Sequence, residues 1–405
     1  MRPCRICGGR SLETFLSLGD QPHCNRFLRA DQLRDPEPAW PLDLCFCPDC
    51  ALVQLGTTVD REIMFLDHPY VSGTTRTLPE HFRALAADIA RRYSLGPDSL
   101  VVDVGSNDGT FLQGFRKLGA RTLGVEPARK IAEIARAGGI ETVEAFFGRD
   151  SAARIVASHG RARTITAAGV FFHIDDLDDF LDGVTELLEE DGVFIVQAMY
   201  LVDILDRTAF DAVYHEHLEY YSLHPLVKLF GRHGLEIVDV ARKDIHGGSF
   251  ILHAVREGRA TASVREILAL ERGRGILSIA TYREFAARVA RIRTDLVGLL
   301  RRLKGEGKRI AAYGAPARGN TLLNYCGIGP DLIDYAAEKN DLKVGLYTPG
   351  MRIPVRHESE ARADPPDCFL VLAWNFFDEF LKKEEEFVRG GGRFILPVPE
   401  PRIVP

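Results

Sequence analysis

Apolar residues in the middle of the chain form short continuous runs separated by amphipathic stretches, a pattern typical of an α/β sheet. Residues 100–115, LVVDVGSNDGTFLQGF, predict a buried strand, a glycine turn and an amphipathic helix. TLGVEP predicts the next strand, and ETVEAFFG predicts a third strand with its turn. Residues 164–184 predict a fourth strand, a loop and a helix, and GVFIVQAM predicts a fifth strand. We therefore expect one α/β domain in this region.

A second α/β unit follows an arginine-rich helical region that begins near Glu257. Apolar residues recur at helical spacing through this region, so its charges form mainly a solvated face. RIAAYGAPARGN then predicts a strand, a glycine loop and a helix, and CFLVLAWN and RFILPVP predict further strands. The fold class is therefore α/β, in three parts with boundaries near residues 75 and 255.

The cysteines are concentrated at the N-terminus, where six of the eight fall within the first fifty residues. Cys4 and Cys7 form one C-x-x-C motif, and Cys47 and Cys50 form another. Two such motifs predict one tetrahedral zinc held by four thiolates, a closed structural site without an open position for catalysis. The alternative, a redox-active pair, would need a helix N-terminus in a βαβ setting, which neither motif has.

Composition narrows the function classes further. The 405 residues carry 51 basic and 57 acidic side chains, and the net charge of −6 argues against a nucleic-acid surface. The N-terminus, MRPCRICGG, lacks the apolar core of a signal peptide. No segment approaches the ~20 apolar residues of a membrane span. We expect a cytoplasmic protein with reduced cysteines and with neither a nucleic-acid nor a membrane partner.

The turn after the first strand of the middle domain has features of a cofactor site. Asp103 ends that strand, and the helix that follows offers free N–H groups to a ligand. Only Gly105 and Gly109 are present, so the turn is neither G-x-G-x-x-G nor a P-loop. Glu126 closes the second strand, where an acid can bind both ribose hydroxyls of a nucleoside. This combination resembles the motifs of S-adenosylmethionine (SAM) methyltransferases, with a dinucleotide cofactor as the alternative.

Two histidine-containing stretches carry candidate chemistry. Residues 214–222, YHEHLEYYS, gather histidines, acidic residues and tyrosines in a mixture that a packed core does not need. A metal site at His215 and His217 is an alternative, but it lacks an obvious third ligand. His173 lies at the carboxyl end of the fourth strand, where open sheets bind ligands. Its alternative role is to cap the helix that follows.

Three glycine-containing stretches are candidates for ligand binding. Residues 246–249, HGGS, can bring backbone amides close to an anion or form a simple hairpin turn. Residues 313–320, YGAPARGN, offer a second helix N-terminus, which indicates a phosphorylated substrate separate from the cofactor. Residues 68–77, HPYVSGTTRT, form either a functional loop or an ordinary domain connection.

In their order along nearly the whole chain, these motifs resemble the sugar C-methyltransferases that act on nucleotide-linked 4-keto-deoxyhexoses. The resemblance rests on the cysteine pairs followed by ALVQL, the Y-x-SGTT loop, DVGSNDG, YHEH-x-x-Y-Y-S, HGGS, YGAPARGNTLLNY and PG-x-x-IPV. It implies a zinc-binding module with an active-site loop at 1–75 and a Rossmann-like, SAM-binding methyltransferase domain at 76–255. It also implies a C-terminal Rossmann-like domain at 256–405 that contributes to nucleotide-sugar binding. The substrate would bind between the last two.

The resemblance also implies a reaction and the residues that perform it. A base removes the proton at carbon 3, next to the ketone, and the enolate attacks the methyl group of SAM. His217 is the expected base, because a histidine has a pKa near neutrality. Glu216 and Tyr214 are its expected partners, Tyr70 would close over the reacting centre, and His173 is a further active-site histidine. The expected SAM contacts are Ser72, Asp103, Gly105, Asn107, Asp108, Glu126, Pro127 and Phe146. The expected substrate contacts are His246, Gly247, Ser249, Tyr313, Arg318 and Asn320.

Several positions depart from the family pattern. Phe250 and Ile251 follow HGGS where relatives often carry leucine and arginine, and Gln197 stands where glutamate is frequent. Arg318 replaces a common lysine, which keeps the charge but changes its geometry. These departures leave the reaction class unchanged but leave the sugar and its nucleotide open.

With dTDP as the expected nucleotide, we expect a monomer in deoxysugar and antibiotic biosynthesis, with SAM and a structural zinc as cofactors. The alternatives are a bifunctional enzyme that also reduces the 4-ketone with NADPH, a nicotinamide-dependent reductase or epimerase, and a non-catalytic binding protein.

Overall fold

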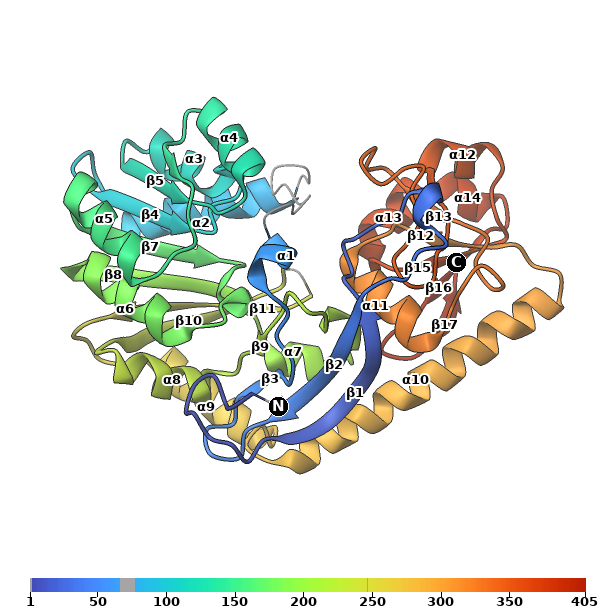
Figure 1. The fold of residues 1–405 in the computed structure, drawn as a ribbon, viewed down its shortest axis with the longest axis horizontal. Helices are drawn as coiled ribbons and strands as arrows, with labels where there is room; N and C mark the ends of the chain where they lie inside the picture. The colour runs from blue at the N-terminus through green and yellow to red at the C-terminus, as the bar shows by residue number, and fades with distance from the viewer. Residues whose placement is uncertain (1, 66–76, 246) are drawn as a thin grey trace.

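The computed structural model describes residues 2–65, 77–245 and 247–405. These residues form three sheets that correspond to the three predicted parts of the chain. Figure 1 shows the middle domain as one lobe, the C-terminal domain as a second lobe, and the N-terminal strands running between them. No described helix is both long enough and apolar enough to cross a bilayer.

The middle domain contains a seven-stranded sheet in the order β10-β11-β8-β7-β4-β5-β6. In chain order the strands are β4 (Leu100–Val104), β5 (Arg121–Val125), β6 (Thr142–Val143), β7 (Ala162–Ala168), β8 (Leu188–Met199), β10 (Glu236–Lys243) and β11 (Ser249–Val255). Only β11 is antiparallel to its neighbours, β8 and β10. The chain leaves β4 toward β5 on one side and returns to β7 on the other. An open sheet binds ligands at such a switch point.

Continuous apolar runs produce this sheet because helices cover both of its faces. Val101 packs with the helices α2 (Thr77–Arg92) and α3 (Thr110–Lys117), where Phe82 stacks on Phe111. Val102, the next residue, belongs to the core on the opposite face. That core includes side chains from α5 (Arg149–His159), α6 (Leu177–Leu187) and α8 (Leu223–Arg232). Helix α4 (Arg129–Ala137) follows β5.

The N-terminal module contains an antiparallel sheet in the order β1-β2-β3-β9. Its own strands are β1 (Glu13–Pro22), β2 (Ala39–Phe46) and β3 (Val53–Leu55), followed by the short helix α1 (Arg61–Phe65). The fourth strand, β9 (Glu219–Tyr220), comes from the middle domain and pairs with β3. The YHEHLEYYS segment therefore joins the zinc-binding module to the methyltransferase sheet.

The C-terminal domain follows α9 (Ala262–Gly273) and the 27-residue helix α10 (Ile279–Gly305), which connects the two lobes in Figure 1. Its sheet has the order β14-β13-β12-β15-β16-β17. The strands are β12 (Ile310–Tyr313), β13 (Ala336–Glu338), β14 (Val355–His357), β15 (Cys368–Val371), β16 (Arg393–Leu396) and β17 (Arg402–Val404). The helices of this domain are α11 (Ala317–Cys326), α12 (Glu358–Ala363), α13 (Phe377–Lys383) and α14 (Glu385–Arg389).

The predicted α/β fold class is confirmed, and the differences are local. The predicted third strand shrinks to two residues, β6, and the chain leaves the sheet after Val143. The fifth strand, β8, starts earlier than the apolar run GVFIVQAM predicts. Helix α6 is capped by Asp176, whose side chain accepts from the Asp179 N–H, so the alternative of His173 as the cap is wrong. The domain boundaries near residues 75 and 255 stay predictions.

Candidate active site

Four cysteines of the N-terminal module form a compact cluster. The Sγ atoms of Cys4, Cys7, Cys47 and Cys50 all lie within 4.8 Å of one another. The Cys4–Cys50 distance is 3.4 Å and the Cys7–Cys47 distance is 3.5 Å. Sulfurs around a tetrahedral zinc lie about 3.8 Å apart, so the cluster fits that metal. Because both C-x-x-C motifs contribute to one cluster, separate redox pairs are not supported.

The turn after β4 is shaped for close approach of a ligand. Gly105 has a φ of +67°, and a Cβ there would lie 2.7 Å from the Val170 side chain. The carboxylate of Glu126, at the end of β5, accepts the Asn107 N–H at 3.0 Å and the Ala128 N–H at 2.9 Å. These bonds fix the acid against the turn, at the end of a strand where a carboxylate can bind ribose hydroxyls. The turn therefore fits the adenosine half of SAM.

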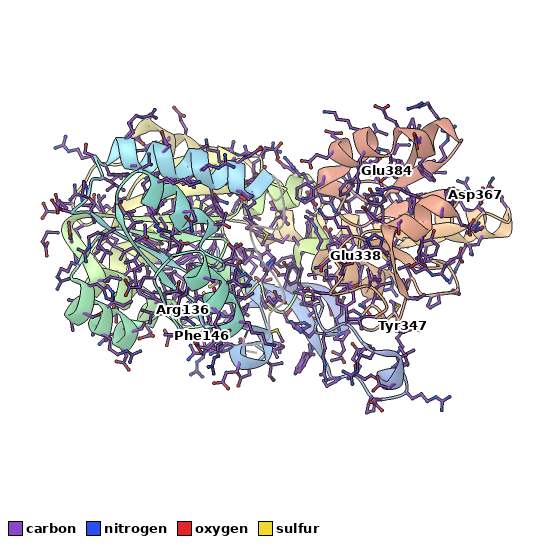
Figure 2. All side chains as sticks on the ribbon, turned by 90° about the horizontal axis from the view of Figure 1, so that it is seen from above. Arg136, Phe146, Glu338, Tyr347, Asp367 and Glu384 are labelled. Carbon is purple, nitrogen blue, oxygen red and sulfur yellow. The ribbon has the colours of Figure 1, made fainter. Side chains whose placement is uncertain are left out.

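Three further predicted cofactor residues lie around this turn. Asp103 is buried and accepts the Thr166 hydroxyl at 2.6 Å. Burial raises the pKa of Asp103 to about 7, although the Thr166 hydrogen bond opposes the rise. On the outer side, the Arg61 guanidinium of α1 lies 4.3 Å from the centroid of the Phe146 ring. Figure 2 labels Phe146 on the lobe of the middle domain. Asp108 accepts the Thr110 N–H at the start of α3.

His217 has one ring nitrogen engaged and one available. Its Nδ1 lies 2.8 Å from the Ala212 carbonyl oxygen, which requires a proton on Nδ1 and leaves a lone pair on Nε2. Nε2 has no hydrogen-bond partner within the described ranges. The ring is 4% exposed and lies against Tyr214, with a centroid distance of 3.8 Å, and against Phe172 at 4.7 Å. The Ala212 carbonyl therefore sets the Nδ1–H tautomer of His217 and leaves Nε2 as the nitrogen that can accept a proton.

The buried surroundings keep the side chains of His217 and Tyr214 uncharged at neutral pH. Burial lowers the pKa of His217 well below its usual value, and the nearby His173 acts in the same direction. The Ala212 carbonyl and Glu216 oppose this lowering. Burial, and then the Glu216 carboxylate, raise the pKa of Tyr214. His217 is therefore a neutral proton acceptor and Tyr214 a protonated hydrogen-bond donor.

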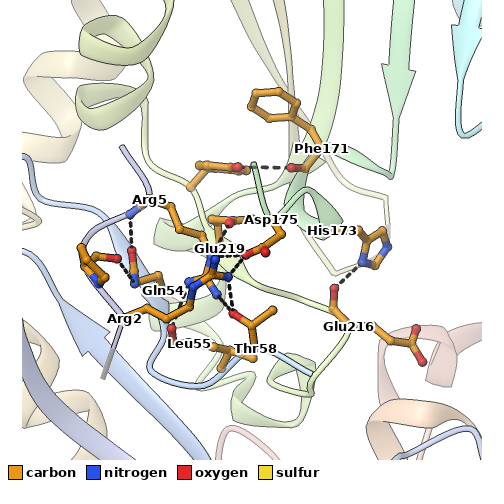
Figure 3. Close-up of polar contacts among 12 residues, drawn as sticks. Arg2, Arg5, Gln54, Leu55, Thr58, Phe171, His173, Asp175, Glu216 and Glu219 are labelled. Carbon is orange, nitrogen blue, oxygen red and sulfur yellow. Dashed lines mark hydrogen bonds and ion pairs between the residues drawn. The ribbon is translucent and has the colours of Figure 1, made fainter. Parts of the chain in front are cut away.

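Glu216 connects the segment to the N-terminal module. Its carboxylate accepts from His23 Nε2 at 2.9 Å and from Asn25 Nδ2 at 2.7 Å, both just beyond β1. Its backbone carbonyl accepts from His173 Nδ1, and Figure 3 shows the carboxylate directed away from that histidine. The sequence suggested a partnership between Glu216 and His217, whereas these bonds show the Glu216 side chain anchoring the N-terminal chain.

His215 is held differently from His217. Its Nε2 donates to the Trp40 carbonyl of β2 at 3.1 Å, and its ring meets the Trp40 ring edge-on. The two histidines are therefore bound to carbonyls of different domains. Across the described part of the chain, the four cysteines are the one group of potential ligands close enough to hold a metal, so no described residue supplies the third ligand that a His-x-His site would need.

Arg5 connects the four-cysteine cluster to the YHEHLEYYS segment (Figure 3). Arg5 lies between Cys4 and Cys7, and its guanidinium donates to the Leu55 carbonyl and to the Thr58 hydroxyl. Its Nε lies 3.2 Å from the carboxylate of the fully buried Glu219, without the alignment of a hydrogen bond, so the contact is an ion pair. Burial raises the pKa of Glu219, and Arg5 opposes the rise. The metal module and the histidine segment thus share a buried contact.

A cavity of about 440 Å³ opens between α1 and the histidines. Its lining includes Thr58, Arg61, Met64, His173, His215 and Glu216. The predicted residues Tyr70 and Ser72 follow α1 in sequence but lie outside the described residues, as does His246. The cavity adjoins the chain that leads to the predicted active-site loop.

Comparisons with known proteins cover all three parts of the chain. Residues 4–65 match a zinc binding domain, residues 78–240 a methyltransferase domain, and residues 244–399 a C-methyltransferase C-terminal domain. Over 404 residues the chain is 39% identical to the C-methyltransferase NovU of Streptomyces niveus. The alignment covers 99% of this chain and 96% of NovU. This chain belongs to that C-methyltransferase family.

Solved structures similar to this chain include further methyltransferases. Magnesium protoporphyrin IX methyltransferase from Synechocystis PCC 6803, with bound SAM, is 15% identical and has a TM-score of 0.33. That alignment covers 44% of this chain and 79% of the other. A SAM-dependent methyltransferase from Geobacter sulfurreducens, in complex with S-adenosyl-L-homocysteine, is 15% identical and has a TM-score of 0.35. It covers 49% of this chain and 99% of the other.

In this SAM-dependent C-methyltransferase, the predicted substrate residues of the C-terminal domain have intramolecular partners. The Tyr313 hydroxyl donates to Glu384, and Asn320 Nδ2 donates to the Cys24 carbonyl at 2.7 Å. Arg318 forms a two-point ion pair with Asp211 of the middle domain, at 2.7 and 2.9 Å. The contacts of Asn320 and Arg318 hold the C-terminal domain against the other two parts of the enzyme. Their roles in substrate binding stay predictions.

Strands β10 and β11 form a hairpin, and the described glycines of the HGGS sequence, Gly247 and Gly248, lie in its turn, as the simpler interpretation predicted. Gly247 has a φ of +88°, and a Cβ there would lie 3.7 Å from Arg318 Nη1 of the C-terminal domain. Gly248 has a φ of +113°, and a Cβ there would lie 2.3 Å from Asp203. The Ser249 hydroxyl donates to the Ile245 carbonyl across the turn. The hairpin turn therefore lies beside Arg318, and an anion-binding role remains open to its backbone amides.

Sequence reasoning missed residues that hold the site through contacts between domains. These are His23, Asn25, Trp40, Asp211 and Trp374. Asp211 precedes YHEH by three positions without any motif of its own, and Trp374 donates to Asp211 from the C-terminal domain at 2.8 Å. His23 and Asn25 follow a strand in an unremarkable turn. Their roles depend on contacts across domains, which no local pattern reveals.

Proposed function

We propose that this C-methyltransferase deprotonates carbon 3 of a nucleotide-linked 4-keto-deoxysugar, with dTDP as the nucleotide, and methylates the resulting enolate. The observation that supports this proposal best is the His217 imidazole. It is buried and neutral, it is oriented by the Ala212 carbonyl, and its Nε2 lone pair is available. Such a group suits removal of a proton next to a ketone.

Each bond change has a proposed role in this scheme. His217 Nε2 takes the carbon-3 proton, and the electrons of the broken C–H bond move onto the ketone oxygen to form an enolate. Tyr214, which remains protonated, donates a hydrogen bond to that oxygen. SAM, when bound, supplies the electrophilic methyl group. The new carbon–carbon bond forms at carbon 3 as the sulfur–methyl bond breaks, and S-adenosylhomocysteine leaves.

We assign the cofactor to the turn after β4 and the nucleotide sugar to the region between the middle and C-terminal domains. Glu126 receives the ribose hydroxyls, and the proposed further SAM contacts are Ser72, Asp103, Gly105, Asn107, Asp108, Pro127 and Phe146. Tyr70 and His173, of which His173 lines the cavity, complete the proposed catalytic set. The proposed nucleotide-sugar contacts are His246, Gly247, Ser249, Tyr313, Arg318 and Asn320. A monomer of this enzyme in deoxysugar and antibiotic biosynthesis would use these groups.

A substrate panel tests the proposal. Purified enzyme is incubated with methyl-labelled SAM and with nucleotide-linked hexoses that differ in nucleotide and in the presence of the 4-ketone. We expect label on carbon 3 of a dTDP-linked 4-keto-deoxyhexose and none on the matching 4-hydroxy sugar. Transfer to oxygen, or equal transfer to the 4-hydroxy sugar, would refute the enolate mechanism. A parallel incubation with NADPH detects any reduction of the ketone.

A further inference from the structure

Asp211 occupies a fully buried position between the histidine segment and the C-terminal domain. It lies in the single-turn helix η4 (Phe210–Ala212), three residues before Tyr214. Arg318 donates to it twice, through Nε at 2.7 Å and through Nη2 at 2.9 Å. Trp374 Nε1 donates a third hydrogen bond at 2.8 Å. A buried carboxylate with two charge-assisted bonds and an indole bond has one well-defined position.

The same short turn carries the acceptor that orients the base. Ala212 follows Asp211 directly, and its carbonyl accepts the His217 Nδ1–H at 2.8 Å. Phe210, on the other side, meets the Tyr325 ring of α11 at 5.4 Å. The C-terminal domain therefore holds this turn through Phe210 and Asp211. The carbonyl of the next residue, Ala212, fixes the His217 tautomer that leaves Nε2 available.

Arg318, which binds Asp211 from the C-terminal domain, is itself held by several contacts. The Arg318 guanidinium lies 4.8 Å from the Trp374 ring, and its Nη1 donates to Asn375 at 3.2 Å. Gly247, in the hairpin turn of the middle domain, lies beside the same Nη1. Arg318 thus stands where the hairpin turn, α11 and η4 meet. Loss of the Asp211 carboxylate would leave a buried cation without its counter-ion, which strongly favours local rearrangement.

We propose that Asp211 is a positioning residue for the base. Through its pair with Arg318 and its bond from Trp374, it fixes the turn whose carbonyl holds His217 in the Nδ1–H tautomer. This inference rests on the proposed function, in which His217 takes the carbon-3 proton. It gives the C-terminal domain a second task beyond substrate binding, because that domain sets the orientation of a base carried by the middle domain.

The first test compares Asp211→Asn with a matched control. Glu271→Gln changes another fully buried carboxylate, which accepts from Leu223, His224 and Tyr200 and has no contact with η4. The assay is solvent deuterium exchange at carbon 3 of a dTDP-linked 4-keto-deoxyhexose, with S-adenosylhomocysteine in place of SAM. Misplacing a catalytic group by about 1 Å can cost on the order of 10²-fold. We expect that loss for Asp211→Asn, unchanged exchange for Glu271→Gln, and unchanged S-adenosylhomocysteine affinity for both.

The second test measures the tautomer without any substrate. In protein labelled with ¹⁵N-histidine, the His217 ring signals, assigned by their absence in His217→Asn, should show the Nδ1–H form in the wild type. Asp211→Asn should give a mixture of tautomers or the other form. Arg318→Met combined with Asp211→Asn should lose no more exchange than the worse of the two single variants, since the pair acts as a unit.

The outcomes separate this inference from the proposed function. If His217→Asn exchanges normally, the proposed base is wrong. If His217→Asn fails to exchange while Asp211→Asn keeps both its exchange rate and its tautomer, the positioning role is wrong. Equal losses in Asp211→Asn and Glu271→Gln would also contradict it, because they would reflect general destabilisation. Should Asp211→Asn not fold, Trp374→Phe removes the indole donor alone and should shift exchange and tautomer in the same direction by a smaller factor; no shift in that variant would overturn the proposal.

Discussion

The two sides of the histidine segment bury the same residue type but leave it in different chemical states. On the side facing the N-terminal module, His215 donates from Nε2 to the Trp40 carbonyl. On the side facing η4, His217 donates from Nδ1 to the Ala212 carbonyl, and its Nε2 lone pair is available. Burial lowers the pKa of both rings. The comparison teaches that burial acts alike on the two rings, and that they differ in which nitrogen is engaged and therefore in which nitrogen could accept a proton.

The largest effect should come from His217→Asn. Asparagine keeps much of the shape and hydrogen-bonding capacity but takes no proton at neutral pH. General-base catalysis contributes on the order of 10²–10⁴ in rate, so we expect kcat to fall by that factor. Calorimetry should show unchanged SAM affinity, because the cofactor turn after β4 is untouched. Weakened SAM binding of similar size would mean that the substitution disturbs the domain as a whole.

Tyr214→Phe should follow, because it removes a hydroxyl and keeps the ring that lies against His217. Loss of one donor to a developing oxyanion typically costs on the order of 10²-fold in kcat. The measurement is steady-state turnover with saturating SAM. A variant as active as the wild type would assign the enolate oxygen to another donor, and would weaken the contrast between the two sides of the segment.

The pH dependence of kcat/KM should also distinguish His217 from His215. A base must be unprotonated, and burial holds the pKa of His217 below its usual value. The acid limb of kcat/KM should therefore lie below the pH range of an ordinary histidine, with a fall of about tenfold per pH unit beneath it. His217→Asn should lack this limb, and His215→Asn should keep it. An acid limb at or above the ordinary histidine value would contradict the buried, neutral base.

Zinc removal should disturb the His215 side first. Cys47→Ser should reduce bound zinc from about one per chain toward none, and Cys45→Ser, which lies outside the cluster, should keep it. Hydrogen exchange should then rise in β2, where Trp40 holds His215, and stay low in β4. Full zinc content in Cys47→Ser would refute the four-cysteine assignment.

His215→Asn should have the smallest effect on turnover. It removes the ring that donates to Trp40, so it should cost on the order of 1 kcal/mol in the free energy of unfolding, with little change in kcat. Urea denaturation measures the first quantity and turnover the second. A large kcat loss at unchanged stability would reverse the roles assigned to the two histidines.

The local features of this molecule could be predicted from the sequence, and the contacts between its parts could not. Continuous apolar runs predict β4 and its neighbours because both faces of that sheet are covered. The two C-x-x-C motifs predict the cysteine cluster because thiolates in such pairs suit one metal. In contrast, His215 meets Trp40 across 175 positions, and Arg318 meets Asp211 across 107. Such pairs follow from how domains pack, which no pattern within a segment encodes.

The same limit explains the position of Glu216. Its place beside His217 in sequence suggested a catalytic partnership, yet its carboxylate accepts from His23 and Asn25 of the N-terminal chain. Neighbouring residues in an irregular segment point in different directions, and only the fold decides which domain each one meets.

Proton abstraction itself gives the most direct test of the account. The measurement is solvent deuterium exchange at carbon 3 of a dTDP-linked 4-keto-deoxyhexose, with S-adenosylhomocysteine in place of SAM so that methyl transfer is absent. Wild type and His215→Asn should exchange at similar rates. His217→Asn should exchange at least ~10²-fold more slowly, as expected for loss of a general base. Exchange by His217→Asn at the wild-type rate would contradict the central claim that His217 is the base.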